Sequence, residues 1–237
     1  QVSTSNGFEC QATPCTFRMP RKDAFRITVA KDGYVAQTHE ITSSVSGAGG
    51  TAMAGNQAWP PTSPWYNKDV PVPARDVEKA KALMKEAGFE RYEIELQHAN
   101  NTTQTQMMQV IQAMVAEAGF DVKLKATEFA TLLSEQTAGN YVLSRSDWSG
   151  RSDPDGNIHQ FVTCKGGIND TKYCNPEVDK LLDEARASTD DAVRKEKYDA
   201  ATKILDDDLP LIYLGHQAYL YATSKAVTGF TPSSDGM

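Results

Sequence analysis

The sequence predicts an α/β fold, a mixed sheet covered by helices, together with a small all-β module ahead of it. Three observations support this prediction. Residues 59–237 alternate amphipathic helical stretches with short strand-like runs, an order typical of strands joined by covering helices. Residues 1–45 hold short alternating runs separated by turn residues, which indicates strands alone. Residues 46–58, between these two parts, are rich in Gly and Ala, which predicts a linker.

The small all-β module is predicted from two strands. Phe25–Val29 alternates apolar and polar residues, and a turn at Lys31–Tyr34 leads into a second strand at Val35–Ile41. A module of this size cannot build a generous core. A cross-link between Cys10 and Cys15 would therefore help to hold it together.

Three helices and three strands are predicted in the first half of the larger block. Asp76 is a candidate N-cap of the first helix, and Gly88 stands at its C-cap position. The predicted elements, in chain order, are a helix over 76–88, a strand over 92–97, a helix over 103–118, a strand over 121–126, a helix over 129–137 and a strand over 141–144. Because helices and strands alternate, we expect parallel strands. The proline-rich stretch 59–67 that precedes them is expected to be extended.

The last third of the chain is equally regular. Asn175 is a candidate N-cap, and Pro176 occupies the first turn of the helix that follows it. A second helix is predicted over about 191–205. Three strands are predicted after it, over 209–214, 218–223 and 227–230, the first of them buried.

Composition and residue spacing exclude several classes of protein. The 237-residue chain has a net charge of −7, and an acidic surface argues against a nucleic-acid partner. No apolar run reaches membrane-spanning length, so we expect no direct membrane insertion. The histidines lack the spacing of a metal site, and no nucleophile has an evident histidine partner. We therefore predict no cofactor, no metal and no catalytic residue.

The four cysteines form two local pairs, Cys10 with Cys15 and Cys164 with Cys174. Zinc sites built from four cysteines usually use tighter C-x2-C knuckles. The spacing therefore favours two local disulfides over metal-bound or free thiols. Disulfides indicate an oxidising compartment, such as a bacterial periplasm or the extracellular side.

The segment WSGRSDPDGN, Trp148–Asn157, is the best candidate for a functional loop. Turn-forming residues dominate it, and it follows the strand predicted over 141–144. It carries a large aromatic residue and charges of both signs, which is typical of a loop that holds a small polar ligand. The alternative is a surface turn whose aspartates cap the next segment.

Four groups of residues after Trp59 carry a resemblance to a known family. They are PPTSPWYN at 60–67, WSGR with DPD inside 148–155, YCNPEVD at 173–179 and LPLIYL at 209–214. In this order they resemble the C-terminal lobe of the extracytoplasmic peptide-binding proteins of ABC transporters, solute-binding family 5. The resemblance implies a lobe of the type II periplasmic-binding-protein fold. Because some members have a comparable local disulfide, it also implies a bridge between Cys164 and Cys174.

The same resemblance implies a non-catalytic protein whose two lobes close over a ligand. In peptide-binding members, an aspartate shortly after the loop tryptophan pairs with the free amino terminus of the ligand. This sequence has Arg151 there, with Asp153 two residues later. An arginine favours a carboxylate, so we expect a peptide-like ligand with an acidic group at this end. We predict Trp148, Arg151, Asp153 and His216 as ligand-binding residues, the last because it follows a predicted buried strand.

The first module has a resemblance of its own. Residues 5–34 are similar to the PEGA-like β-sandwich modules of bacterial envelope lipoproteins. The shared features are a C-x4-C around Thr13-Pro14, the Pro-Arg-Lys at 20–22 and the strand end Lys-x-Gly-Tyr at 31–34. Such modules imply a non-catalytic surface or interaction domain.

These resemblances imply an extracytoplasmic solute-binding component, or a fragment of one, of an ABC importer for peptides or peptide-like solutes. Its partners would be that ligand and a membrane permease, and its location the periplasm or another extracytoplasmic part of the bacterial envelope. One alternative is an envelope or structural interaction protein that binds no ligand. A hydrolase using Asp153 and Asp155 is disfavoured, because carboxylates two residues apart on one loop do not oppose each other across a substrate.

Overall fold

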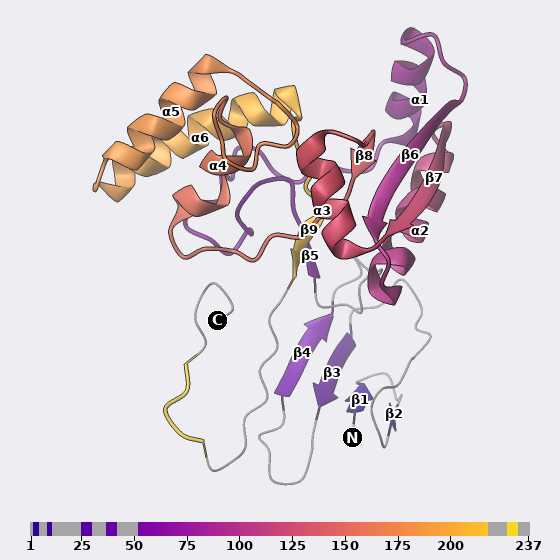
Figure 1. Ribbon diagram of the computed structural model, residues 1–237. Helices are drawn as coiled ribbons and strands as arrows, with labels where there is room; N and C mark the ends of the chain where they lie inside the picture. The colour runs from indigo at the N-terminus through magenta and orange to yellow at the C-terminus, as the bar shows by residue number, and fades with distance from the viewer. Residues whose placement is uncertain are drawn as a thin grey trace. The chain divides into compact units, whose positions relative to one another are not determined.

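The computed structural model describes residues 2–4, 9–10, 25–29, 37–41, 52–217 and 227–231 (Figure 1). The chain divides into two compact units. Unit 1 combines residues 1–54 with residues 215–237, and unit 2 is continuous over residues 55–214. The candidate loop at Trp148–Asn157 lies entirely in unit 2.

Apart from residues 227–231, the described part of unit 1 consists of antiparallel strands. One sheet has the order β2-β1-β3-β4, with β1 at Val2–Thr4, β2 at Glu9–Cys10, β3 at Phe25–Val29 and β4 at Gln37–Ile41. The two predicted strands are thus confirmed where the structure describes them. A second pair joins β5, Ala52–Ala54, to β9, Gly215–Gln217, with Met53 opposite His216. β5 falls inside the segment predicted as a linker.

Unit 2 begins with a parallel α/β arrangement. In chain order its elements are α1 (Val77–Glu86), β6 (Tyr92–Ala99), α2 (Thr102–Ala116), β7 (Phe120–Thr127), α3 (Phe129–Ala138) and β8 (Leu143–Ser144). The sheet order is β7-β6-β8, and both pairs are parallel, as the alternation of helices and strands predicted. Asp76 caps α1 by accepting a hydrogen bond from the Lys79 backbone N–H at 2.9 Å. Gly88 follows α1 with a φ of +85°, which favours glycine.

The two faces of this sheet differ in chemistry because side chains alternate along a strand. Leu96 of β6 and Val122 of β7 point to one face, where they are buried with Met108 of α2. The opposite face carries charged residues, which form cross-strand ion pairs: Arg91, Glu93, Glu95, Asp121, Lys123 and Lys125. α3 covers one end of this charged face, where Glu135 accepts a hydrogen bond from the buried Gln97 side chain.

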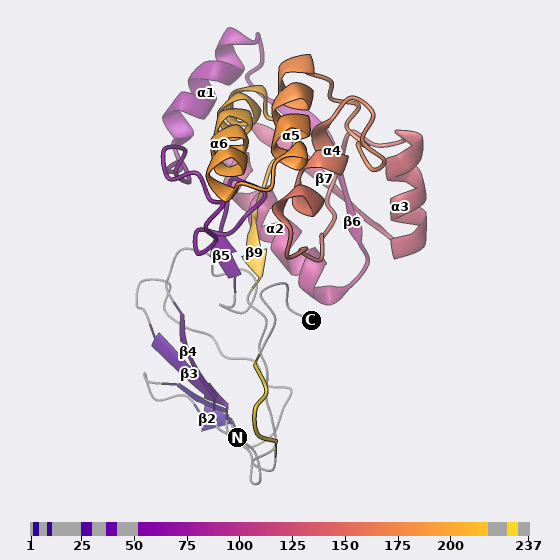
Figure 2. The same ribbon diagram turned by 90° about the vertical axis from the view of Figure 1, so that its left-hand side faces the viewer.

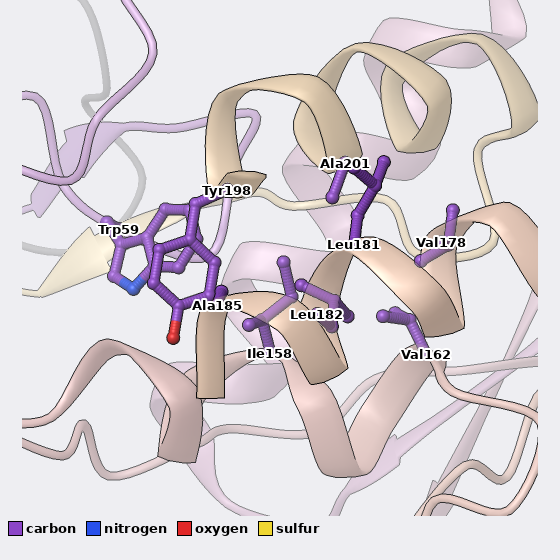
Figure 3. Close-up of a cluster of buried hydrophobic side chains, with 9 residues drawn as sticks. All are labelled: Trp59, Ile158, Val162, Val178, Leu181, Leu182, Ala185, Tyr198 and Ala201. Carbon is purple, nitrogen blue, oxygen red and sulfur yellow. The ribbon is translucent and has the colours of Figure 1, made fainter. Parts of the chain in front are cut away.

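The rest of unit 2 is helical. It comprises the 3-10 helix η1 (Pro154–Asn157), α4 (His159–Val162), α5 (Pro176–Ala187) and α6 (Asp191–Asp208). Figure 3 shows the core between these helices, which contains Trp59, Ile158, Val162, Val178, Leu181, Leu182, Ala185, Tyr198 and Ala201. The ring of Tyr198 lies edge-on to Trp59 at 5.1 Å between centroids and to Trp65 at 5.7 Å. Two aromatic side chains from the segment before α1 thereby complete the core of α5 and α6.

The proline-rich segment is not extended, and the prediction that it would be is wrong. Its backbone makes turns, with the Ser63 N–H bonded to the Pro60 carbonyl and the Tyr66 N–H to the Ser63 carbonyl. Proline also favours the early positions of such turns. The buried Gln57 side chain bonds both the N–H and the carbonyl of Asn67, and Asn67 donates to the Asp199 carbonyl of α6.

Two of the three strands predicted after α6 are absent from the described residues. No described strand covers 209–214, and the prediction of a buried strand there is wrong, since Ile212 is 71% exposed and Leu209 is exposed too. Leu209 ends α6 in the left-handed region, with a φ of +47°, so the chain turns as it leaves the helix. The strand predicted over 227–230 is wrong as well, because the structure assigns none there. The strand predicted over 218–223 lies outside the described residues.

Candidate functional site

The loop from Trp148 to Asn157 follows the carboxyl end of β8, and α4, which begins shortly after the loop, lies beside α5 (Figure 2). In open α/β sheets, ligands bind outside the carboxyl ends of the parallel strands. The chain leaves β8 with one further sheet bond, from the Arg145 N–H to the Gln97 carbonyl at 2.8 Å. The sheet therefore sets the direction in which the loop starts.

A cluster of side chains fixes the residue just before the loop. The Asp147 carboxylate pairs with the guanidinium of Arg145 at 2.5 Å and accepts a hydrogen bond from Gln104 at 2.5 Å. Gln104 lies in the first turn of α2, and the Arg145 side chain is largely buried. The residues just before Trp148 are thus bonded to the sheet through Arg145 and to α2 through Asp147.

Asn157 joins the two ends of the loop through its side-chain amide. Its Oδ1 accepts hydrogen bonds from the Trp148 indole N–H at 3.2 Å and from the Arg151 backbone N–H at 2.7 Å. Its Nδ2 donates to the carbonyls of Arg151 at 2.7 Å and Asp153 at 3.4 Å. The loop is consequently a closed and bonded structure.

Trp148 and Arg151 form the exposed part of the loop. The Arg151 guanidinium carbon lies 4.6 Å from the centre of the Trp148 ring, within the range of a cation–π contact. Trp148 is 41% exposed, and its ring lies edge-on to Phe161 at 4.8 Å between centroids. Within the described residues, the hydrogen bonds of this guanidinium are all made by Nη1, to the carbonyls of Ser149 and Gly150 and to the Ser149 hydroxyl.

Gly156 leaves room for Arg151. A Cβ at Gly156 would lie 3.0 Å from both Cβ and Cγ of Arg151, closer than side chains ordinarily pack. A larger residue there would force Arg151 to move by a few tenths of an ångström.

Asp153 fastens the loop to α6. Its carboxylate accepts a hydrogen bond from the Asp155 N–H at 2.9 Å, which caps η1, and pairs with Arg194 at 2.8 Å. Burial favours a higher pKa for this carboxyl, but the Arg194 and backbone hydrogen bonds hold its pKa below the usual value. Arg194 is 14% exposed and also donates to the Tyr198 hydroxyl in the helical core.

Asp155 fastens the loop to α5. Arg186 binds its carboxylate through two hydrogen bonds, of 3.0 and 2.8 Å, and this contact raises the pKa of the Arg186 guanidinium. The two aspartates and their arginines, with Ser188 and Thr189, line a surface hollow of about 460 Å³. The charged side chains that line this hollow already form ion pairs with one another.

The structure brings together three of the four predicted ligand-binding residues. Trp148, Arg151 and Asp153 share the loop, with Trp148 and Arg151 in contact and Asp153 turned to Arg194. His216 lies in β9 of unit 1, and its place in a ligand site stays a prediction.

The partners that hold the loop could not be predicted from the sequence. Asn157 was counted only as the last residue of the segment, and Arg186 and Arg194 were not singled out. Arg186 is 31 residues from Asp155 and Arg194 is 41 residues from Asp153, so spacing gives no signal of these contacts. The Asx-type cap at Asp153 was readable, because Asp-Pro favours the start of a turn.

Cys164 and Cys174 form a disulfide, which confirms that pairing. The segment between them is also held by Asn169, whose Nδ2 donates to the carbonyls of Thr163 and Tyr173 at 2.9 and 2.7 Å. The predicted pair of Cys10 and Cys15 lies outside the described residues, because Cys15 is not described.

The described residues lack a metal-binding cluster and a membrane-spanning helix. They contain no group of three or more His, Cys, Asp or Glu side chains placed to hold a metal ion. Among the described helices, none is both long and apolar enough to cross a bilayer.

Comparison with known proteins decides the family. Residues 37–169, more than half of the chain, match the family described as "Bacterial extracellular solute-binding proteins, family 5 Middle". The chain belongs to this family. Its members are non-catalytic solute-binding proteins, in agreement with the prediction that the chain is not an enzyme. The match begins before the predicted linker, and no comparison identifies a PEGA-like module.

Two curated relatives illustrate the similarity. The chain is 30% identical over 190 residues to di/tripeptide-binding protein 4 of Pseudomonas aeruginosa (strain UCBPP-PA14), covering 76% of this chain and 36% of that protein. It is 29% identical over 219 residues to the dipeptide-binding protein of Escherichia coli (strain K12), covering 88% and 39%. The chain therefore spans less than two fifths of the length of these relatives.

A solved structure shows the same fold. The dipeptide-binding protein from Pseudoalteromonas sp. SM9913, in complex with Met-Leu, superposes with a TM-score of 0.67 and is 27% identical. The match covers 78% of this chain and 39% of that one. The predicted α/β lobe of the type II periplasmic-binding-protein fold is confirmed.

Proposed function

We propose that this chain is a solute-binding component, or a portion of one, of an extracytoplasmic ABC importer for peptides or peptide-like solutes. In this role it captures a ligand without chemical change and delivers it to a membrane permease. Membership in solute-binding family 5 and similarity to proteins named for di- and tripeptides support the proposal.

The loop after β8 is the observation that carries the proposal. It stands at the carboxyl edge of the parallel sheet and exposes Trp148 and Arg151. Its residues Asp155 and Asp153 are bonded to α5 and α6, and Asp147, just before the loop, is bonded to α2. A binding group is effective when its support is already ordered, because less conformational entropy is then lost on binding. We assign Trp148 and Arg151 to ligand contact, and Asp153 to the support of the loop.

Arg151 suits a carboxylate. A guanidinium presents its donors as a planar fork that matches two carboxylate oxygens. Since Nη1 is directed to the carbonyls of Ser149 and Gly150, the edge formed by Nε and Nη2 is the part suited to a ligand. A peptide with an acidic group at this end fits such an edge, whereas a free ammonium group would be repelled.

Isothermal titration calorimetry tests this proposal. The whole chain is titrated with di- and tripeptides that carry a carboxylate and with the same peptides in amide form. Hydrogen bonds to charged groups contribute about 1.5–3 kcal/mol, so the carboxylate form should bind at least about tenfold more tightly. One lobe alone leaves the ligand partly in water, so the titration extends to about 1 mM, which corresponds to ~4 kcal/mol of binding free energy.

Two variants make the titration specific. Arg151→Ala should remove the preference for the carboxylate form. Arg91→Ala removes an equally positive, exposed side chain at the amino-terminal edge of the sheet and should leave affinity unchanged. Equal binding by wild type and Arg151→Ala would contradict the assignment of Arg151, and no saturable binding of any peptide would contradict the proposed function of this chain.

The alternative function, an interaction protein that binds no ligand, has one observation in its favour. Leu209, Ile212 and Leu214 are exposed within a single short run after α6. Contiguous exposed apolar side chains are typical of surfaces that contact another protein. Association detected by analytical ultracentrifugation in an envelope extract, together with a failure of every peptide titration, would favour this alternative.

A further inference from the structure

We infer that Asn157 is the positioning residue of the ligand site, setting the places of Trp148 and Arg151 without touching the ligand itself. This inference rests on the proposed function, because it assigns Trp148 and Arg151 to ligand contact. Nothing in the family match or in the names of the relatives assigns a role to Asn157.

The Asn157 amide is used to its full hydrogen-bonding capacity. A side-chain amide has two acceptor positions on oxygen and two N–H donors. All four are engaged inside the loop, with bonds of 3.2, 2.7, 2.7 and 3.4 Å to Trp148, Arg151 and Asp153. No donor or acceptor of this amide is left to bind a ligand.

Asn157 also holds the backbone of Arg151. The Arg151 backbone N–H donates to the Asn157 side-chain oxygen, and the Arg151 carbonyl accepts from the Asn157 side-chain nitrogen. These two bonds fix the peptide groups on either side of the Arg151 Cα, and hence the direction of its Cα–Cβ bond. The guanidinium then lies over the Trp148 ring at 4.6 Å.

The bond from Trp148 to Asn157 bears on the kind of ligand group that fits the site. Because its indole N–H donates to Asn157, the indole is not available as a hydrogen-bond donor to the ligand. What remains exposed is an apolar ring surface and the charge of Arg151. The positioned pair therefore favours an acceptor group, such as a carboxylate, next to an apolar one.

An isosteric substitution isolates this role. Asn157→Asp keeps the size of the side chain and the acceptor oxygen, but it replaces the two N–H donors with a negatively charged oxygen. That oxygen would face the Arg151 carbonyl at 2.7 Å and the Asp153 carbonyl at 3.4 Å. The expected result is a loop that opens while the rest of unit 2 keeps its fold.

The matched control is Asn140→Asp. Asn140 is an exposed asparagine between α3 and β8, and its side chain makes no hydrogen bond in the part of the chain that the structure describes. The two variants therefore add the same charge to the same unit of the protein. Only Asn157→Asp changes the loop.

The experiment combines nitrogen-15 NMR spectra with the peptide titrations described above. In Asn157→Asp, the Trp148 indole N–H and the Arg151 amide N–H should shift and exchange faster with solvent, and peptide affinity should fall at least tenfold. Asn140→Asp should change affinity by less than twofold. Affinity within twofold of wild type in a folded Asn157→Asp variant would overturn the inference.

Two further outcomes are also decisive. If wild type binds no peptide, the proposed function fails, but the loop resonances still report on Asn157: unchanged loop resonances in Asn157→Asp overturn its positioning role, and changed ones support it. If Asn157→Asp does not fold, exchange is measured in wild type. A Trp148 indole N–H that exchanges as fast as a free indole would overturn the inference, and a protected one would support it.

Discussion

Nine side chains are buried together between the helices of unit 2 and the segment around Trp59, whereas the largest buried cluster against the three-stranded sheet holds only Leu96, Met108 and Val122. The two halves also differ at their surfaces. In the sheet half, α1, α2 and α3 expose large apolar side chains, namely Leu83, Val110, Met114, Phe129 and Leu133. In the helical half, charged side chains of the loop are paired with Arg186 and Arg194.

This difference shows which part of unit 2 supports the ligand loop. The helical half has a buried core of its own and holds the loop at Asp153 and Asp155. The sheet half determines the direction of the loop at Arg145 and Asp147 but leaves apolar surface uncovered. Substitutions in the helical core should therefore be costly, and substitutions on the exposed sheet-side helices should not.

The largest effect is expected for Tyr198→Ala. Tyr198 is fully buried and lies edge-on to Trp59 and Trp65, so its removal leaves a cavity and unpairs two aromatic contacts. We expect a loss of about 3–5 kcal/mol in the free energy of unfolding, measured with urea. Tyr198→Phe keeps the ring and loses only the hydrogen bond from Arg194, so the free energy of unfolding should fall by about 1 kcal/mol. Similar losses for the two variants would show that ring packing does not stabilise this core.

The next effect concerns the disulfide. Reducing the bridge between Cys164 and Cys174, or replacing both residues with alanine, releases a short closed loop in the unfolded chain. Chain-entropy arguments give about 3 kcal/mol for a loop of this size. Urea unfolding with and without reductant measures the loss. The double alanine variant is the control, because it lacks this bridge: any change of its stability with reductant comes from the predicted Cys10–Cys15 bridge and is subtracted from the change in wild type.

A smaller effect is expected from acid. The pKa of Asp153 is lower in the folded protein than its ordinary value, through the hydrogen bonds from Arg194 and the backbone. The contribution of Asp153 to the free energy of unfolding is therefore fully present above the pKa of an unfolded aspartate, about 3.9. It is lost as the pH falls through the pKa of Asp153 in the folded protein. Because this carboxylate is largely exposed, we expect its ionised form to add about 1 kcal/mol or less to the free energy of unfolding.

Asp153→Asn tests this contribution directly. The variant should be less stable than wild type at pH 7, and the difference should shrink as the pH falls below about 4. Thermal unfolding across this pH range provides the measurement. A difference that stays constant down to pH 2 would mean that the charge of Asp153 does not contribute.

The smallest effect is expected for Leu83→Gln. Leu83 is 54% exposed on α1, and glutamine is nearly as good a helix former as leucine. The free energy of unfolding should change by less than about 0.5 kcal/mol. Met84→Gln, at the adjacent but buried position, is the contrasting variant and should cost several times more. A large loss for Leu83→Gln would mean that this helix face is covered in solution.

Local signals in the sequence were sufficient for most helices and strands of unit 2. Asp76 and Asn175 each cap the helix they were expected to cap, and the spacing of apolar residues located the strands β6 and β7 and the helices α2 and α3. These features depend on residues within one or two turns of each other. Motifs quoted from the family likewise located the loop at Trp148–Asn157.

Other features depended on contacts that spacing does not encode. The roles of Arg186 and Arg194 follow from the packing of α5 and α6 against the loop, and the four bonds of Asn157 follow from how the loop closes. The run after α6 was predicted as a buried strand from its aliphatic residues. An apolar pattern indicates that a strand could be buried, but it does not supply the surface that would cover Ile212.

The most direct test of the ligand site is a map of the residues that respond to a peptide. The nitrogen-15-labelled chain is titrated with a dipeptide that carries an acidic side chain, and its NMR spectrum is followed to saturation. The Trp148 indole N–H and the Arg151 amide N–H should shift together with one dissociation constant, while Tyr92 and Arg91, at the start of β6, remain unchanged. Saturable shifts at other residues with none at Trp148 or Arg151 would contradict the assignment of this loop as the ligand site.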